Sequence, residues 1–257
     1  MGPVTTGTML GETFRLFGRG AGTLLGISLI VYSPFLLGSL SFFVVTFPQG
    51  LETLVQYASA LIAAPIATAA MIHAVFQLAR GSHATIADSL RAAVSRIWAV
   101  LGLSLLLSLV FIVGWIMCCV PGVVAYIGLF VAMPALMVER IPVFKTFDRS
   151  WFLTTDYKLM TFGVAVVLFL LKVALGAFVM VAGFMVIMAS GFSSSLPAEA
   201  PMDSTYPDWF RGGFLLAGLL VEVPLAALTA TAATVAYLQL RQTKEGLGEE
   251  ELLAVFD

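Results

Sequence analysis

Long apolar stretches alternate with short polar segments along almost the whole chain. A helix needs about 20 apolar residues to cross the roughly 30 Å of hydrocarbon in a bilayer. Six stretches meet this length, so the pattern predicts an all-α integral membrane protein with six transmembrane helices. We expect a single transmembrane domain over residues 1–240 and a cytoplasmic tail over 241–257, with spans at about 21–47, 54–78, 97–118, 122–138, 159–190 and 212–240.

The third and fourth spans are separated only by a short break at Pro121 and Gly122. Proline has no amide hydrogen to donate within a helix, and glycine tolerates turn conformations. Without this break the apolar run would be too long for one crossing. The two spans are therefore expected to form a tight hairpin.

A segment with apolar residues at helical spacing precedes each pair of spans, at 9–19, 84–97 and 142–156. Amphipathic helices of this kind lie in the membrane interface. We therefore expect three repeats, each an amphipathic interfacial helix followed by a transmembrane hairpin. The alternative is that the segments are unrelated, because any basic amphipathic segment before a transmembrane span has a similar pattern. The segments share a signature: Glu12-Thr13-Phe14-Arg15, Asp88-Ser89-Leu90-Arg91 and Lys145-Thr146-Phe147-Asp148.

The basic residues are distributed unevenly between the two sides of the predicted bundle. Of 13 Lys and Arg residues, 11 fall on one side, Arg211 falls on the other and Lys172 lies inside a span. Because positively charged loops stay in the cytoplasm, this distribution predicts that both termini are cytoplasmic. The acidic loop over 191–211 is then expected outside.

Small residues concentrate in the second and sixth spans, where alanines recur throughout. In lipid, small residues let helices approach closely, and packing drives their association. We therefore expect these two spans at the centre of the bundle and the Phe- and Met-rich fifth span facing lipid. Gly18, Gly22 and Gly26 form a small-residue ladder. We expect it to be an internal seam rather than a dimer contact.

Lys172 and Glu222 are the two charged residues inside predicted spans, which makes them candidate functional residues. At the helical rise, Lys172 lies roughly 20 Å from the cytoplasmic end of its span and Glu222 roughly 15 Å from the outer end. In a core of about 30 Å their depths differ by about 5 Å. We expect an intramembrane ion pair, which is either a structural lock or a coupling or lipid-contact site. Lys172 could instead snorkel to the interface.

Other chemistry is not indicated by the sequence. Nucleophile, phosphate-cradling and dinucleotide motifs are absent, so we expect no catalytic residues and no cofactor. The adjacent Cys118 and Cys119 have no neighbouring His or carboxylate, and no metal site is expected. The composition gives no basic excess for binding nucleic acid. Trp151, Tyr206 and Trp209 are predicted to be interfacial anchors.

Several motifs together resemble the bacterial membrane domain attached to some glycerophosphoryl diester phosphodiesterases, and its stand-alone inner-membrane relatives. The resemblance covers nearly the whole chain and implies a six-helix module in the bacterial inner membrane. It implies no phosphodiesterase activity, because that chemistry belongs to a separate soluble domain. The motifs are Arg80-Gly81, Ala87-Asp88-Ser89-Leu90-Arg91, Val120-Pro121-Gly122-Val123, Thr146-Phe147-Asp148-Arg149-Ser150-Trp151-Phe152-Leu153-Thr154 and Tyr237-x-x-Leu240-Arg241.

The sequence favours a non-enzymatic multi-pass module, a scaffold or an accessory subunit of a membrane complex. Its expected partners are membrane lipids, including bound ones, and other proteins of the complex. The alternative is a small transporter or channel for a lipid or polar solute that uses Lys172 and Glu222. A polar cavity around that pair would favour transport. Prolines that interrupt helices often line cavities, and the candidates are Pro34, Pro65, Pro134 and Pro224.

The predicted topology can be tested by labelling a cysteine in the acidic loop. Ser194→Cys, in a Cys118→Ser/Cys119→Ser background, is expected to react with a membrane-impermeant thiol reagent in intact cells. The charge distribution places this loop outside, within reach of the reagent. If this cysteine reacts only after the cells are opened, the loop is cytoplasmic and the predicted orientation is wrong.

Overall fold

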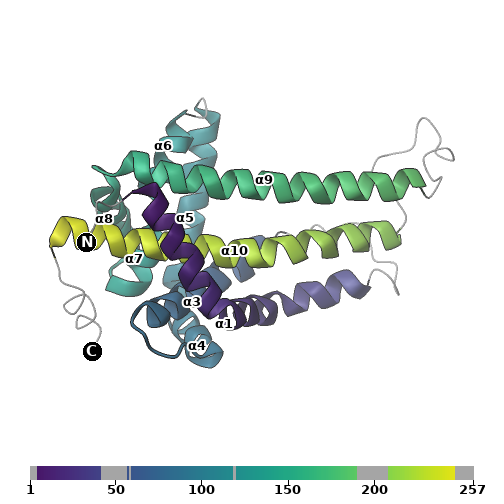
Figure 1. The fold of residues 1–257 in the computed structure, drawn as a ribbon, viewed down its shortest axis with the longest axis horizontal. Coiled ribbons are helices and arrows are strands. Elements are labelled where there is room, and N and C mark those ends of the chain that lie inside the picture. Colours follow the sequence, from purple (N-terminus) through teal and green to yellow (C-terminus); the bar gives the residue numbers. More distant parts are fainter. Residues whose placement is uncertain (1–4, 42–56, 58, 118–119, 190–207, 247–257) are drawn as a thin grey trace.

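The computed structural model describes residues 5–41, 57, 59–117, 120–189 and 208–246. These residues are helical, with short connections and no strand among them. The helices in chain order are α1 (Thr6–Ser41), the π-helix η1 (Ser59–Ala63), α3 (Ala64–Ala79), α4 (Ile86–Ser95), α5 (Ile97–Ile116), α6 (Val120–Gly128), α7 (Ala132–Glu139), α8 (Val143–Thr154), α9 (Lys158–Ala189) and α10 (Asp208–Glu245) (Figure 1).

Six helical segments are long and apolar enough to cross a membrane, as predicted. Each overlaps one of the six spans expected from the hydrophobic pattern. The described part of the chain is therefore all-helical, and the chain has the composition of a multi-pass membrane protein. The segments are Thr6–Leu37, Leu61–Ala79, Ile97–Ile116, Val120–Glu139, Lys158–Ala189 and Gly212–Glu245.

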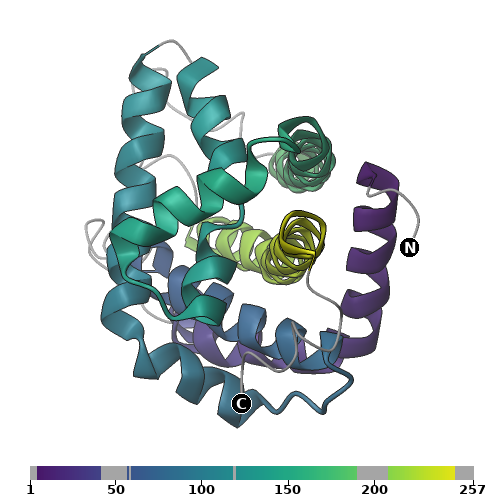
Figure 2. The same cartoon turned by 90° about the vertical axis from the view of Figure 1, so that its left-hand side faces the viewer.

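Two boundaries differ from those predicted. The N-terminal amphipathic segment 9–19 is the first part of α1 rather than a separate helix. The ribbon of α1 bends, so that this part runs across the bundle and the remainder runs along it (Figures 1 and 2). At the other end, α10 continues beyond 240 to Glu245, because its last turn makes ion pairs with Arg149 of α8 and with Asp156 just after α8. The rest of the predicted tail and Ser194 lie outside the described residues.

The fourth predicted span is not one straight helix, because it breaks between α6 and α7. Pro134 lies in the first turn of α7, where its ring would clash with the carbonyl of Phe130 in a continuous α-helix. The chain instead makes a tight turn over 129–131. Pro34 and Pro224, by contrast, lie inside continuous helices.

Helix α8 folds back onto the α6–α7 break. The Ser150 hydroxyl donates to the carbonyl of Gly128 at 2.8 Å, and the Thr154 hydroxyl lies 3.1 Å from the same oxygen. A Cβ on Gly128 would meet the Trp151 ring at 2.4 Å, so only glycine allows this approach. The backbone carbonyl exposed by the break therefore finds hydrogen-bond donors inside the protein.

Helices α3 and α10 form the centre of the bundle, as the distribution of small residues predicts. In the end-on view α10 is surrounded by α9, α1, α3 and α7 (Figure 2). Most alanines of both helices are buried, among them Ala70, Ala74, Ala227 and Ala236. Only five of the 32 residues of α9 are buried, which agrees with its predicted lipid-facing position.

The glycine ladder in α1 is not the internal seam that was predicted. Gly18 and Gly22 are exposed, and a Cβ on either would meet nothing within 4 Å. The close contacts belong to Gly26, which packs against Ile86, and to Gly20, which packs against Leu78. Because α1 bends, a regular spacing of four residues does not keep one face of the helix on the core.

The three copies of the four-residue signature share one structural feature. Their second residues, Thr13, Ser89 and Thr146, are all buried. Each hydroxyl donates to the carbonyl four residues earlier, at 2.7, 2.8 and 3.1 Å respectively. Such a bond lets a polar side chain enter an apolar contact without an unsatisfied donor. Ser28, Thr68 and Thr231, which lie outside the signature, make the same bond, so the threefold repeat stays a prediction.

Candidate functional site

The structure brings Lys172 of α9 and Glu222 of α10 together. The Lys172 Nζ atom lies 3.1 and 3.2 Å from the two carboxylate oxygens of Glu222. The two helices run side by side along the bundle, which places the residues opposite one another (Figure 1). The pair is on the surface, since the Lys172 side chain is 59% exposed and that of Glu222 is 43% exposed. Its charges therefore face outward between two helices.

The predicted interfacial anchors are described only in part. Trp151 packs against Gly128 and carries the Lys158 ammonium 4.2 Å above its ring, in a cation–π contact. Tyr206 lies outside the described residues, and Trp209 is described only as part of α10. Cys118 and Cys119 also lie outside them. Among the described residues no cluster of three metal-binding side chains occurs.

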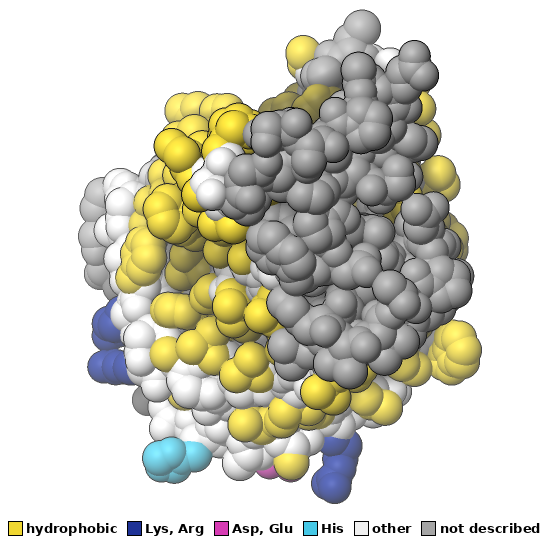
Figure 3. Space-filling model, turned by 90° about the vertical axis from the view of Figure 1, so that its right-hand side faces the viewer, with side chains coloured by type: hydrophobic (Ala, Val, Ile, Leu, Met, Phe, Trp, Pro, Cys, Tyr) yellow, Lys and Arg dark blue, Asp and Glu magenta, His cyan; other side chains and the backbone are white. Residues whose placement is uncertain are grey.

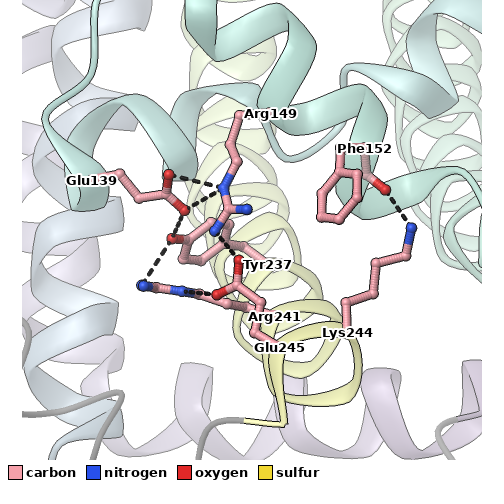
Figure 4. A network of polar contacts seen from close by, with 7 residues as sticks. All are labelled: Glu139, Arg149, Phe152, Tyr237, Arg241, Lys244 and Glu245. Atoms are coloured by element: carbon pink, nitrogen blue, oxygen red, sulfur yellow. Dashed lines mark hydrogen bonds and ion pairs between the residues drawn. The ribbon is translucent and has the colours of Figure 1, made fainter.

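A polar network that the sequence did not reveal joins the end of α7, the middle of α8 and the end of α10 (Figure 4). Its centre is Glu139, the last residue of α7. The Arg149 Nε atom of α8 lies 2.7 and 2.9 Å from the two Glu139 oxygens. The Tyr237 hydroxyl of α10 donates to the same carboxylate at 2.7 Å. Glu139 thus binds two different helices at once.

The network continues along one face of α10. Arg241 donates from Nε to Glu245 at 2.9 Å and from a terminal nitrogen to the Tyr237 hydroxyl at 3.3 Å. Glu245 in turn forms an ion pair with Arg149. The network thus contains two carboxylates and two guanidinium groups, so its net charge is zero. They are Glu139, Glu245, Arg149 and Arg241. The Arg241 side chain is only 8% exposed, which this pairing makes tolerable.

Next to the network, Lys244 links α10 to α8. Its ammonium donates to the backbone carbonyl of Phe152 and lies 2.7 Å from the Asp156 carboxylate. It also lies 4.5 Å from the centre of the Phe152 ring. The last turn of α10 is therefore fixed to α8 by contacts of several kinds.

The electrostatics of Arg149 are those of a permanently charged structural group. Burial lowers the pKa of the Arg149 guanidinium, but its hydrogen bonds to Glu139 and Glu245, and their charges, outweigh that effect and raise the pKa above its ordinary value. A guanidinium held in this way does not exchange protons near neutral pH. The arrangement suits helix docking rather than acid–base catalysis.

A sequence signal for the network existed in the spacing of Tyr237, Arg241 and Glu245. Residues four apart lie on the same face of a helix, so these three polar groups share one stripe at the end of the last span. Two of the motifs quoted for the family resemblance, those containing Arg149 and Tyr237, meet here in space. The sequence pattern did not show that Glu139 would join them.

Comparison of the chain with protein-family models, with curated proteins and with solved structures finds no match. The resemblance to the phosphodiesterase-associated membrane domain therefore stays a prediction.

A double-mutant cycle on Glu139 and Arg149 tests whether the network holds the helices together. Arg149→Met leaves Glu139 and Glu245 without this partner, and we expect the free energy of unfolding to fall by about 3 kcal/mol. In the Arg149→Met protein, Glu139→Gln should lower the free energy of unfolding much less than it does in the unchanged protein. The expected coupling energy between the two residues is about 1–3 kcal/mol. Reversible unfolding in mixed micelles measures these changes.

The matched control is Lys172→Met, because Lys172 pairs with Glu222 whereas Arg149 pairs with Glu139 and Glu245. Its effect should add to that of Arg149→Met. Additive effects of Glu139→Gln and Arg149→Met would show that the contact between these two residues does not stabilise the fold.

Proposed function

We propose that the chain is a non-enzymatic multi-pass membrane module that serves as a scaffold or accessory subunit of a membrane complex. The observation that carries this proposal is the exposed Lys172–Glu222 pair on the outer side of α9 and α10. Charged groups inside the hydrocarbon are costly and usually face a protein interior or a water-filled cavity. A pair that is open on one side is best explained by a partner that covers it.

The apolar surface around the pair supports the same reading. Beyond Lys172, the outer half of α9 exposes large side chains such as Phe178, Met180 and Phe184, and Ile187 is the one buried residue there. Viewed from this end of the molecule, the coloured side chains are mostly hydrophobic, with Lys and Arg at the periphery (Figure 3). A transmembrane helix with one polar residue at the depth of the pair fits this surface.

The remaining polar groups favour a structural role. The network at the end of α10 is charge-balanced, and the buried hydroxyls of Ser89, Thr146 and Thr231 donate to backbone carbonyls. These contacts satisfy the groups but activate no nucleophile. Transport would need a polar cavity around Lys172 and Glu222, whereas both side chains face outward, so the module is the better reading.

The proposed orientation places the network end of the molecule in the cytoplasm. Arg96, Arg140, Arg149, Arg241 and Lys244 gather at this end, which agrees with the distribution of basic residues that indicates the cytoplasmic side. The proposed location is the bacterial inner membrane, on the basis of the resemblance. In this arrangement α4 and α8 act as interfacial helices before the hairpins that follow them.

Site-specific photo-crosslinking in native membranes tests the proposed partner surface. A photoreactive residue at Val173, which is exposed beside Lys172, is expected to form an adduct with one discrete protein. The matched control is Leu109 on α5, which is also exposed and should crosslink only to lipid. Lys172→Met/Glu222→Gln should weaken the protein adduct at Val173, because the partner's polar residue then has no charges to bind. Lipid adducts alone at both positions would contradict the proposal.

A further inference from the structure

A cavity of about 340 Å³ opens at the same end of the bundle as the polar network, but it is built from other residues. It lies where the end of α3, the junction of α4 and α5, and the end of α7 meet. The residues that line it are His73, Ala92, Ser95, Arg96, Met137 and Arg140. The cavity has two guanidinium groups and one imidazole in its lining and no carboxylate.

The two arginines are the positive charges of this cavity. Arg96 donates from one terminal nitrogen to the carbonyl of Leu136 at 2.5 Å, which uses one of its five hydrogen-bond donors. Arg140 makes no hydrogen bond or ion pair with the described part of the chain. Burial lowers the pKa of Arg96, and the nearby charge of Arg140 lowers it further. Two like charges in the lining of one cavity favour an anion between them.

His73 adds an unsatisfied polar group to the same lining. Its Nδ1 atom is buried and has no hydrogen-bond partner among the described residues. A buried polar atom without a partner is uncommon in native proteins and calls for an explanation. Asp88 is the acidic group that acts electrostatically on His73, but it does not line the cavity, and its carboxylate accepts a hydrogen bond from Thr85 at 2.5 Å. The Ser95 hydroxyl already donates to Ala92.

The cavity lies where the chain leaves the candidate spans. Arg96 directly precedes the span Ile97–Ile116, and Arg140 directly follows the span Val120–Glu139. His73 lies within two turns of the end of Leu61–Ala79. Phosphate groups of a bilayer lie at this depth, just beyond the hydrocarbon, and basic pockets between helix ends are suited to them.

We propose that this cavity binds a phosphate group, with the guanidinium groups of Arg96 and Arg140 as the charged donors and His73 as an additional polar contact. Arginine suits this role because its planar donors match the spacing of phosphate oxygens. The structural alternative is that Arg96 only caps α7 through Leu136. That contact explains neither the second cation, Arg140, nor the unpaired His73. The phosphate belongs either to a phospholipid headgroup or to a free phosphate in solution.

Binding measurements on the full chain in nanodiscs test the proposal and distinguish the two sources. In the first arm, the protein in phosphatidylcholine discs is titrated with inorganic phosphate, followed by calorimetry. In the second, the protein in discs that contain phosphatidylglycerol is analysed by native mass spectrometry for retained anionic lipid. Binding in the first arm assigns a free phosphate, and specific retention in the second assigns a headgroup.

Arg140→Gln is the main variant, because within the described residues the Arg140 side chain makes no hydrogen bond or ion pair whose loss would unfold the protein. We expect it to weaken binding about tenfold in the arm that shows binding, the effect of losing one charge-assisted contact. Arg91→Gln removes an exposed arginine of α4 that does not line the cavity and should change binding less than twofold. Arg96→Gln should weaken binding to a similar degree as Arg140→Gln.

The proposal is overturned if neither arm shows binding, or if Arg140→Gln binds as well as the unchanged protein. It is also overturned if Arg91→Gln and Arg140→Gln weaken binding equally, because the anion would then respond only to the general positive charge of this surface. Thermal unfolding of each variant in the same discs verifies that the compared proteins are folded.

Discussion

The fold depends on one constraint: a polar group inside an apolar bundle must find its hydrogen-bond partner within the chain. The helices satisfy most backbone groups, and the hydroxyl side chains of the buried helices follow the same rule. Thr231 and Thr234 of α10 donate to carbonyls one turn earlier. The interruption between α6 and α7, inside a candidate span, is covered by Ser150 and Thr154 of α8. The position of α8 follows from that requirement.

The same constraint explains how charge is distributed over the molecule. At the cytoplasmic end proposed above, four charged side chains neutralise one another and fix α7, α8 and α10 together: Glu139, Arg149, Arg241 and Glu245. Nearby, the positive cavity lacks such a balance, which is why an anion is the natural occupant. Along the bundle, Lys172 and Glu222 pair with each other, but both side chains remain exposed on the outer side of α9 and α10. The places where the chain does not complete its own contacts are those where we propose partners.

The sequence predicted the number of spans, the central position of α3 and α10, and the proximity of Lys172 to Glu222, because these depend on hydrophobic length and helical periodicity. It did not predict the bend of α1, so the glycine ladder was assigned to the wrong face. The polar network was missed because Glu139 and Tyr237 are 98 residues apart along the chain, and their meeting is set by how α7 and α10 pack. The cavity was missed for the same reason, since its cations come from separate helix ends.

Hydrogen exchange at the α6–α7 break tests the central constraint most directly. In lipid nanodiscs, the amides over 129–132 should exchange as slowly as those of the adjoining helices, because α8 closes the break. In Ser150→Ala/Thr154→Val, exchange at these amides should rise about tenfold, with the lost hydrogen bonds at Gly128 as the cause. Fast exchange in the unchanged protein, or unchanged exchange in the variant, would contradict the account.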